Sequence, residues 1–283
     1  MKKRIILVVL VIIAVWIAIA AVASHRLVVA QYVVPSNKVS EEVKVVQLSD
    51  LHFHEFGAGN IELVDTVRKC APDIIVITGD LFDIQGDSVP KQLVQQLVGI
   101  APVYYAPGNH EFDINGEYEQ NYLPFLASTG VHVLDNTSTL VSVNAQKIQL
   151  SGLYSTASLA YENEYFRTGL EQLKADQEQQ YFQLLLAHMP DYFAMYMEYD
   201  YDLVLSGHTH GGHMRIPFTQ IGAYAAGPQH TLLPKYVYGE YRSGDKRMIV
   251  SAGLGGGSKL QNAIPRFGNP YEVVEIVITP VNE

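Results

Sequence analysis

Five short segments of this chain each follow an apolar, β-like stretch and carry side chains that bind metal ions. They read Asp50-Leu51-His52, Gly79-Asp80, Gly108-Asn109-His110-Glu111, Ala187-His188 and Gly207-His208-Thr209-His210. One Asp-x-His or Gly-Asp is common in ordinary turns, but five such clusters in succession are not. The carboxyl ends of neighbouring strands lie at one edge of an α/β sheet, where binding sites collect. We therefore expect the five segments to meet and to supply one two-metal site.

Strand and helix patterns alternate along the chain and predict an α/β fold. Apolar or β-branched runs predict strands at residues 43–48, 74–77, 103–105, 131–134, 139–143, 148–150, 182–186, 203–205, 248–250 and 273–278. Apolar residues at helical spacing predict helices at residues 61–70, 90–100, 117–127, 164–173 and 192–197. The adjacent short strands between residues 131 and 150 indicate some antiparallel pairing.

The N-terminus combines a cluster of cations with a long apolar run. Lys2, Lys3 and Arg4 precede residues 5–23, which carry no charge. As a helix this run would reach about 28 Å, close to the hydrocarbon thickness of a bilayer. We therefore expect a transmembrane helix, with the rest of the chain on the extracytoplasmic face of the cell membrane because cations stay inside. The alternative is a cleaved signal peptide and a secreted protein, since Ala21-Val22-Ala23 fits a cleavage site.

Length and composition favour one large domain. We expect an anchor or signal segment at residues 1–24, a connector at 25–42 and a folded domain at 43–283. The chain has 283 residues, 48% of them hydrophobic, which is enough for a substantial core. Its net charge of −10 repels polyanions, so no nucleic-acid partner is expected. The lone Cys70 excludes an intrachain disulfide and a thiolate metal cage.

The ligand types favour hydrolysis of phosphate esters. Imidazoles and carboxylates without thiolates suit borderline divalent ions. Two such ions about 3.5–4 Å apart repel each other, and a carboxylate between them offsets that repulsion. A water molecule shared by both ions would lose a proton near neutral pH. The resulting metal-bridging hydroxide could attack a phosphate ester in line.

The five segments resemble the calcineurin-like metallophosphoesterase family, in particular its membrane-associated bacterial phosphodiesterase-like branch. The resemblance extends from Val43 to Ile278. It implies a four-layer sandwich of two mixed β-sheets flanked by helices, which would follow the N-terminal transmembrane helix. It also implies two divalent ions, usually manganese, iron or zinc. The family pattern assigns Asp50, His52 and His210 to one metal, Asn109, His188 and His208 to the other, and Asp80 to both.

His110 remains once the ligands are assigned. It lies beside Asn109 and is expected to protonate the departing oxygen or to stabilise charge in the transition state. Asp83 and Glu111 are expected to orient ligands rather than to bind metal. The sequence assigns no role to His54 and His213 near the motifs, or to the possible phosphate clamps Arg215 and Arg266.

A location beside the membrane favours phosphodiesters or lipid- and envelope-linked phosphates as substrates. The apolar residues between Ile216 and Tyr241 either cover an edge of the sandwich or form a rim that contacts lipid. The alternative function is a metal-binding scaffold of the same fold without catalysis, although none of the expected ligands is missing. A zinc peptidase is disfavoured because the chain has no His-Glu-x-x-His. The oligomeric state is not specified by the sequence.

Overall fold

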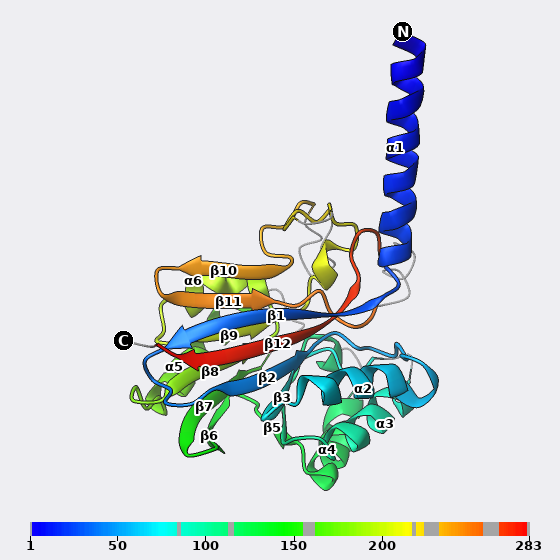
Figure 1. Cartoon of the computed structure of the whole chain (residues 1–283). Helices are drawn as coiled ribbons and strands as arrows, with labels where there is room; N and C mark the ends of the chain where they lie inside the picture. The colour runs from blue at the N-terminus through cyan, green and yellow to red at the C-terminus, as the bar shows by residue number, and fades with distance from the viewer. Residues whose placement is uncertain are drawn as a thin grey trace.

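The computed structural model describes residues 2–83, 86–112, 116–154, 162–216, 219–223, 232–256 and 266–281. Two six-stranded mixed sheets form its centre (Figure 1). The first has the order β1 (Leu27–Ser36), β12 (Tyr271–Pro280), β2 (Val43–Leu48), β3 (Ile74–Thr78), β4 (Val103–Ala106) and β5 (His132–Val133). The second has the order β10 (Gly239–Ser243), β11 (Lys246–Val250), β9 (Leu203–Ser206), β8 (Phe182–Ala187), β7 (Gln146–Leu153) and β6 (Thr137–Val143).

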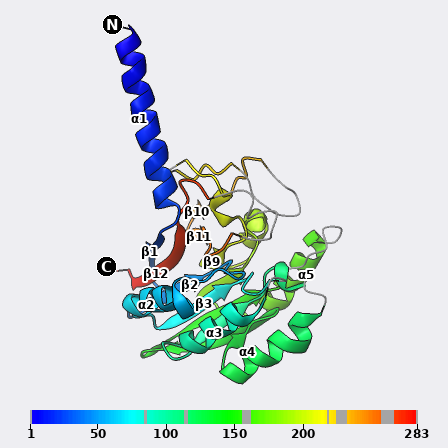
Figure 2. The ribbon, with the colours of Figure 1, turned by 90° about the vertical axis from the view of Figure 1, so that its right-hand side faces the viewer.

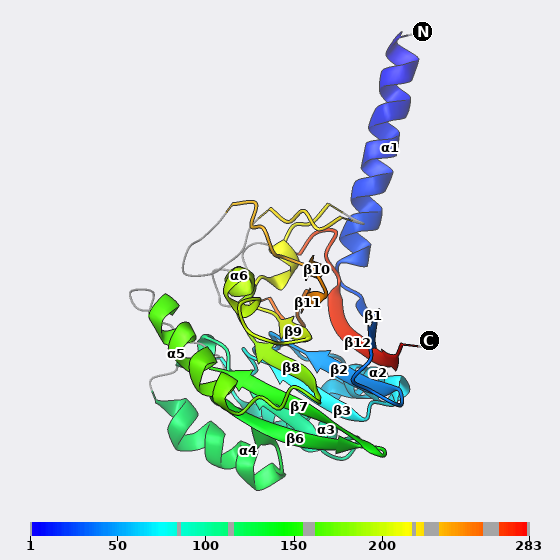
Figure 3. The ribbon, with the colours of Figure 1, turned by 90° about the vertical axis from the view of Figure 1, so that its left-hand side faces the viewer.

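Helices cover the outer faces of both sheets. The first sheet carries α2 (Ile61–Cys70), α3 (Ser88–Leu97) and α4 (Leu123–Thr129), and the second carries α5 (Glu162–Ala175) and α6 (Phe193–Tyr196). Figure 2 shows the first group and Figure 3 the second. Short helical turns lie at η1 (Ala58–Asn60), η2 (His110–Phe112), η3 (Tyr118–Tyr122), η4 (Pro190–Tyr192) and η5 (His210–Gly212). The predicted four-layer α/β sandwich is therefore present.

Alternation of side chains along β2 and β3 explains the layers. Val45 and Ile74 point into the core between the two sheets, whereas Val46 and Ile75 pack against the helices. Every residue of β3 is buried, as expected for a β-branched strand that is covered on both faces. This double burial fixes the register, since a shift of one residue would exchange the two faces.

Two strands lie where the sequence predicted none. Residues 27–36, expected to belong to a connector, form β1, which pairs in parallel with β12 at the edge of the first sheet. Residues 239–243 form β10, which pairs antiparallel to β11. Backbone hydrogen bonds therefore make residues 27–36 part of the sandwich rather than a free connector.

The N-terminal helix α1 (Lys2–Ala23) projects away from the sandwich (Figure 1). Within the described part of the chain, no helix combines the length and apolar character that a bilayer crossing requires. This finding contradicts the predicted transmembrane helix and, with it, the single-pass membrane localisation.

The parallel strands bring the five sequence motifs to one edge of the sandwich. In the first sheet β2, β3 and β4 run parallel, and in the second β8 and β9 run parallel. The Gln47 amide joins the sheets below this edge, donating to Thr78 Oγ1 and to the Ser206 carbonyl, both at 2.9 Å. Just beyond, Asp50 N donates to Gly79 O at 3.1 Å and Gly207 N donates to His188 O at 3.0 Å. Loops from both sheets therefore meet at this edge of the sandwich.

Candidate metal centre

Most of the predicted ligands have a backbone conformation that L-residues rarely adopt. The left-handed φ angles are 53° at Asp50, 54° at His52, 51° at Asp80, 69° at His208 and 48° at His210. Each such residue costs of the order of 1 kcal/mol. A fold keeps such strain only where the surrounding structure holds it, and it gathers at functional sites. The chain thus turns sharply just after these strands, and the turn directs the predicted ligands toward the other loops.

Two glycines allow these loops to approach each other. A Cβ atom on Gly108 would lie 2.3 Å from Asp80 Oδ1, and one on Gly207 would lie 1.9 Å from Ser49 Oγ. Neither position has room for any side chain. The glycines of the third and fifth motifs are therefore required by close packing against the first and second motifs.

The structure gathers six of the predicted ligands into two overlapping groups. In each group, one ligand atom per residue lies within 4.8 Å of the others. One group holds Asp50, His52, Asp80 and His210, and the other holds Asp80, His188 and His208. Asp80 belongs to both groups, and all six side chains are buried. Two cations would therefore lie side by side and share one carboxylate.

Short contacts define the centre of the site. Asp80 Oδ2 lies 3.2 Å from His188 Nε2 and 3.8 Å from His52 Nε2. His210 Nε2 lies 3.3 Å from His52 Nε2 and 3.7 Å from Asp50 Oδ1. Several imidazole nitrogens and carboxylate oxygens thus point at one small volume, as a metal site requires.

Several of these atoms have no hydrogen-bond partner among the described residues. Asp50 Oδ2, His188 Nε2 and the amide oxygen of Asn109, the seventh predicted ligand, are buried and unpaired. A buried polar atom without a partner costs about 1–3 kcal/mol. Divalent ions would satisfy all three atoms, so this donor set fits the metals that the sequence predicted.

Hydrogen bonds on the far side of the histidines orient their rings. His188 Nδ1 donates to the Thr78 carbonyl at 2.7 Å, and His210 Nδ1 donates to the Gly255 carbonyl at 3.1 Å. His52 Nδ1 donates to Asp83 Oδ2 at 3.0 Å. Each bond places a proton on Nδ1 and turns Nε2 toward the centre, where it could bind a metal ion, as is typical of metal-ligating histidines.

Glu111 organises the backbone around Asp80. Its carboxylate accepts hydrogen bonds from the amides of Asp80, Leu81, Phe82 and Gly108, at 2.7 to 3.1 Å. The side chain is fully buried and contacts the loop rather than the centre of the site. Glu111 therefore supports the loop of Asp80, whereas Asp83, which accepts from His52 Nδ1, also lies in a group with His52 and His110 that could hold a metal ion.

The electrostatics of the metal-free site favour bound cations. Burial opposes a charged Asp80, but the neighbouring His188 and His110 outweigh it and hold the pKa of Asp80 well below its usual range. Burial also opposes charge on His188, yet the Asp80 and Asp50 carboxylates raise its pKa to about 10. Burial and the positive His188 lower the pKa of His208 to about 3. The Asp80 carboxylate thus holds positive charge on His188, whereas His208 stays neutral and able to bind a metal ion.

His110 differs from the predicted ligands. Its Nε2 lies 4.0 Å from Asp80 Oδ2 and its Nδ1 lies 3.6 Å from Asp83 Oδ2, both beyond hydrogen-bond length. The side chain is 17% exposed, whereas the six grouped ligands are buried. His110 therefore lies where the centre meets solvent.

The four residues without a predicted role lie outside the two ligand groups. His54 stacks on Tyr271, and the buried His213 ring lies 5.3 Å from that of His210. The Arg215 guanidinium lies 3.5 Å above the Tyr238 ring. Arg266 is 7% exposed and donates to backbone carbonyls, so it is not placed to clamp a phosphate. Sequence reasoning missed this function of Arg266, which has no local motif.

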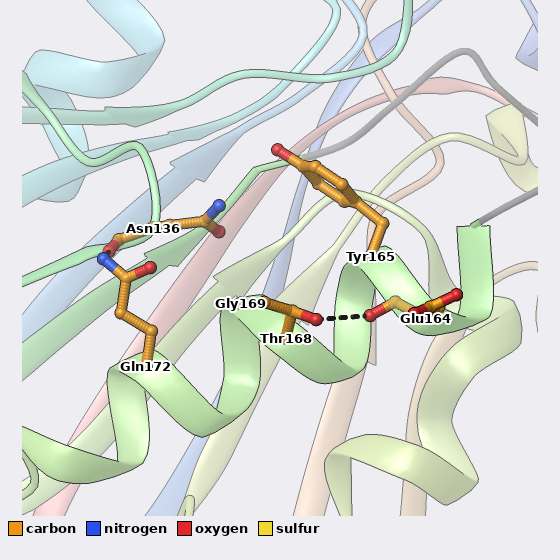
Figure 4. A pocket seen from close by; sticks show the side chains of 6 residues that line it. All are labelled: Asn136, Glu164, Tyr165, Thr168, Gly169 and Gln172. Atoms are coloured by element: carbon orange, nitrogen blue, oxygen red, sulfur yellow. Dashed lines mark hydrogen bonds between the residues drawn. The ribbon is translucent and has the colours of Figure 1, made fainter.

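The apolar stretch expected near the site is described only in part. Phe218 and Tyr224 lie outside the described residues. Leu232 and Leu233 are 75% and 70% exposed. A separate cavity of about 340 Å³ lies beside α5, and none of the predicted ligands lines it (Figure 4). It is lined by Asn136, Glu164, Tyr165, Thr168, Gly169 and Gln172.

Several known proteins are similar to this chain in sequence. An uncharacterized metallophosphoesterase of Campylobacter jejuni is 31% identical over 225 residues, which cover 77% of this chain and 55% of the relative. The phosphodiesterase YaeI of Escherichia coli is 28% identical over 75% of each chain. The chain thus spans little more than half the length of the first relative.

A solved structure shows the same fold. The phosphopantetheinyl hydrolase of Mycobacterium tuberculosis has a TM-score of 0.51 at 13% identity, over 84% of this chain and 96% of that chain. The family model described as calcineurin-like phosphoesterase matches residues 43–212, which contain all five motifs. The comparisons do not identify a membrane-associated branch. On this match over more than half of its length, the chain belongs to the calcineurin-like phosphoesterase family, whose members use divalent metal ions.

Proposed function

We propose that this protein is a dinuclear metal-dependent phosphoesterase. One observation carries the proposal: Asp80 is common to two groups of buried ligands. A carboxylate between two cations is the arrangement that brings two metals close enough to act on one phosphate. Membership of the calcineurin-like phosphoesterase family supports the same reaction class.

The two groups suggest which residues would hold each ion. Asp50, His52 and His210 would bind the first ion, and His188, His208 and Asn109 the second, with Asp80 between them. Two divalent ions at this site would polarise the phosphate and activate a water molecule for in-line attack. The chain itself supplies rigidity, because the orienting hydrogen bonds fix the imidazole rings before substrate arrives.

His110 would complete the reaction. Its partly exposed ring lies at the boundary between the ligand groups and solvent, where a leaving group would emerge. There it would donate a proton to the departing oxygen as the phosphorus–oxygen bond breaks.

Phosphodiesters are the proposed substrates. The support is the name of one relative, the phosphodiesterase YaeI, which matches 75% of this chain. The earlier preference for lipid-linked phosphates depended on a membrane location, which the helices of the structure do not support. We therefore propose a phosphodiester without a lipid requirement.

The proposal is tested with purified full-length protein. The protein is stripped with a chelator, reloaded separately with Mn²⁺, Fe²⁺ or Zn²⁺, and assayed on bis-p-nitrophenyl phosphate and p-nitrophenyl phosphate. We expect two ions per chain and hydrolysis that favours the diester. Asp80→Asn should lose at least one ion and most activity, while the control Asp65→Asn on the surface of α2 should keep both.

The same experiment distinguishes the alternative function. A metal-binding scaffold would hold two ions and hydrolyse neither substrate. A protein that never holds more than one ion would contradict the dinuclear site itself.

A further inference from the structure

The C-terminal segment 266–272 contacts the loops that surround the predicted ligand His210. The family model ends at residue 212, so this segment lies outside the part of the chain that the family pattern describes. Its best-placed polar side chains are Arg266 and Asn269, which are both buried. Their contacts are to main-chain carbonyls of the loops that carry or support His210.

Arg266 holds the loop that follows β11. Its Nη2 donates to the Ala252 carbonyl at 2.8 Å, and its Nε donates to the Gly255 carbonyl at 3.2 Å. Nη1 donates to the Pro270 carbonyl at 3.4 Å, so all three guanidinium nitrogens are engaged. The guanidinium also packs against the Tyr271 ring, 4.8 Å from its centre. A planar group with five donors is suited to bind several carbonyls at once.

The Gly255 carbonyl links Arg266 to the metal centre. It accepts from Arg266 on one side and from His210 Nδ1 on the other. Gly255 packs directly against the first motif, because a Cβ there would lie 2.4 Å from the Leu51 carbonyl oxygen and 2.7 Å from the Asp50 carbonyl oxygen. The acceptor that sets the His210 tautomer is thus fixed between the first motif and Arg266.

Asn269 holds the other side of the same residue. Its Nδ2 donates to the His210 carbonyl at 2.6 Å and to the His213 carbonyl at 3.3 Å. The loop approaches so closely that a Cβ on Gly211 would lie 2.2 Å from Asn269 Oδ1. His210 has a left-handed φ of 48°, so its conformation needs such external support.

We propose that Arg266 and Asn269 are positioning residues for His210: Arg266 fixes the acceptor of its ring, and Asn269 fixes its backbone. The inference rests on the proposed role of His210 as a metal ligand. Neither residue would touch metal or substrate. Orienting partners of metal ligands typically contribute 10–100-fold to metal affinity.

Metal affinity, measured without substrate, tests this inference. Zn²⁺ is titrated into chelator-stripped full-length protein in competition with a chromophoric chelator, which resolves the two binding steps. Arg266→Gln should weaken one of the two steps by about 10–100-fold and leave the other near its original value. Asn269→Ala should weaken the same step, and Arg266→Lys, which keeps the charge but loses the planar fork, should lie between Arg266→Gln and the unmodified protein. The exposed Arg242→Gln on β10 is the matched control and should change neither step.

A spectroscopic readout separates positioning from general stability. Nitrogen-15 NMR of labelled histidines reports which ring nitrogen of His210 carries the proton. The metal-free protein should show a single Nδ1–H form, and Arg266→Gln should show a mixture of both forms. His188, whose ring is held by the Thr78 carbonyl instead, should give the same nitrogen signals in both proteins.

The inference is overturned if Arg266→Gln keeps both affinities and the single His210 form. It is equally overturned if both binding steps weaken together, since that indicates a general loss of structure. Should Arg266→Gln fail to fold, Asn269→Ala decides by the same two outcomes. The phosphoesterase proposal is judged separately, because a protein that binds two ions but hydrolyses nothing would contradict it and leave this test intact.

Discussion

His110 is the histidine of the centre that reaches solvent, and its chemistry is separable from metal binding. Its nearest measured contacts to Asp80 and Asp83, at 4.0 and 3.6 Å, are too long to be structural hydrogen bonds. We predict that His110→Asn keeps both metals and lowers kcat about 10²–10⁴-fold, the usual contribution of a general acid. Steady-state kinetics on a diester, together with metal analysis of the same sample, measures both quantities.

The exposed His25→Asn is the control for this substitution and should match the unmodified protein. A substrate whose leaving group needs no proton gives a second check, because its hydrolysis should suffer much less in His110→Asn. If kcat is unchanged with a poor leaving group, His110 has no part in proton transfer.

At the scale of single residues, the sequence indicates the metal ligands but not the residues that position them. Metal-binding residue types directly after strands are visible along the chain, and the structure brings six of the seven predicted ligands within reach of each other. Arg266 and Asn269 act through main-chain carbonyls, which every residue type possesses. A hydrogen bond to a carbonyl therefore leaves no pattern in the partner sequence, and only the folded chain reveals it.

At the scale of elements, β1 is the main departure from expectation. Each predicted strand and helix overlaps an observed one, but β1 was expected to be part of a connector. It has Pro35 near its end, and all of its residues except Val34 are exposed or only partly buried, because it lies at the edge of the sheet. Its partner β12 is more than 240 residues away in the chain, so no local signal could predict the pairing.

Two neighbouring valines test whether β1 is part of the sandwich. Val34 is 2% exposed and packs into the core between the sheets, whereas Val33 is 58% exposed. We predict that Val34→Asp lowers the free energy of unfolding by about 3 kcal/mol or more, because it buries an unpaired carboxylate. Val33→Asp should cost about 1 kcal/mol or less. Urea unfolding of the full-length variants measures both, and equal losses would mean that β1 is not packed as described.

At the scale of the whole molecule, the sequence patterns predict an α/β fold, and the resemblance of the five motifs implies the two-sheet sandwich. Strands that are apolar on both faces need cover on both sides, which here comes from the other sheet on one face and from helices on the other. The transmembrane prediction came from the N-terminal cations and the apolar run that follows them, but the described helices do not meet the requirements of a membrane crossing. Burial also perturbs charged groups far along the chain from the metal motifs, and Glu272 is the clearest case.

Glu272 makes the stability of the metal-free protein depend on pH. Burial raises its pKa from 4.5 to about 7, although the Ala252 amide and Arg215 partly oppose the shift. Between these two values the folded chain holds a proton that the unfolded chain has released. Stability therefore falls as pH rises through this window, by about 3 kcal/mol in total.

Replacing Glu272 with Gln should remove this dependence. The amide keeps an oxygen for the Ala252 N–H, which now donates to Glu272 Oε2 at 2.8 Å, and it cannot ionise. We predict that Glu272→Gln gains about 3 kcal/mol of stability relative to the unmodified protein on going from pH 4.5 to pH 8. Urea unfolding in the presence of chelator, at several pH values across this range, measures the gain, and the exposed Glu41→Gln is the control. Parallel stability curves for the two proteins would show that Glu272 is already ionised throughout, with its charge neutralised by Arg215 in the folded chain.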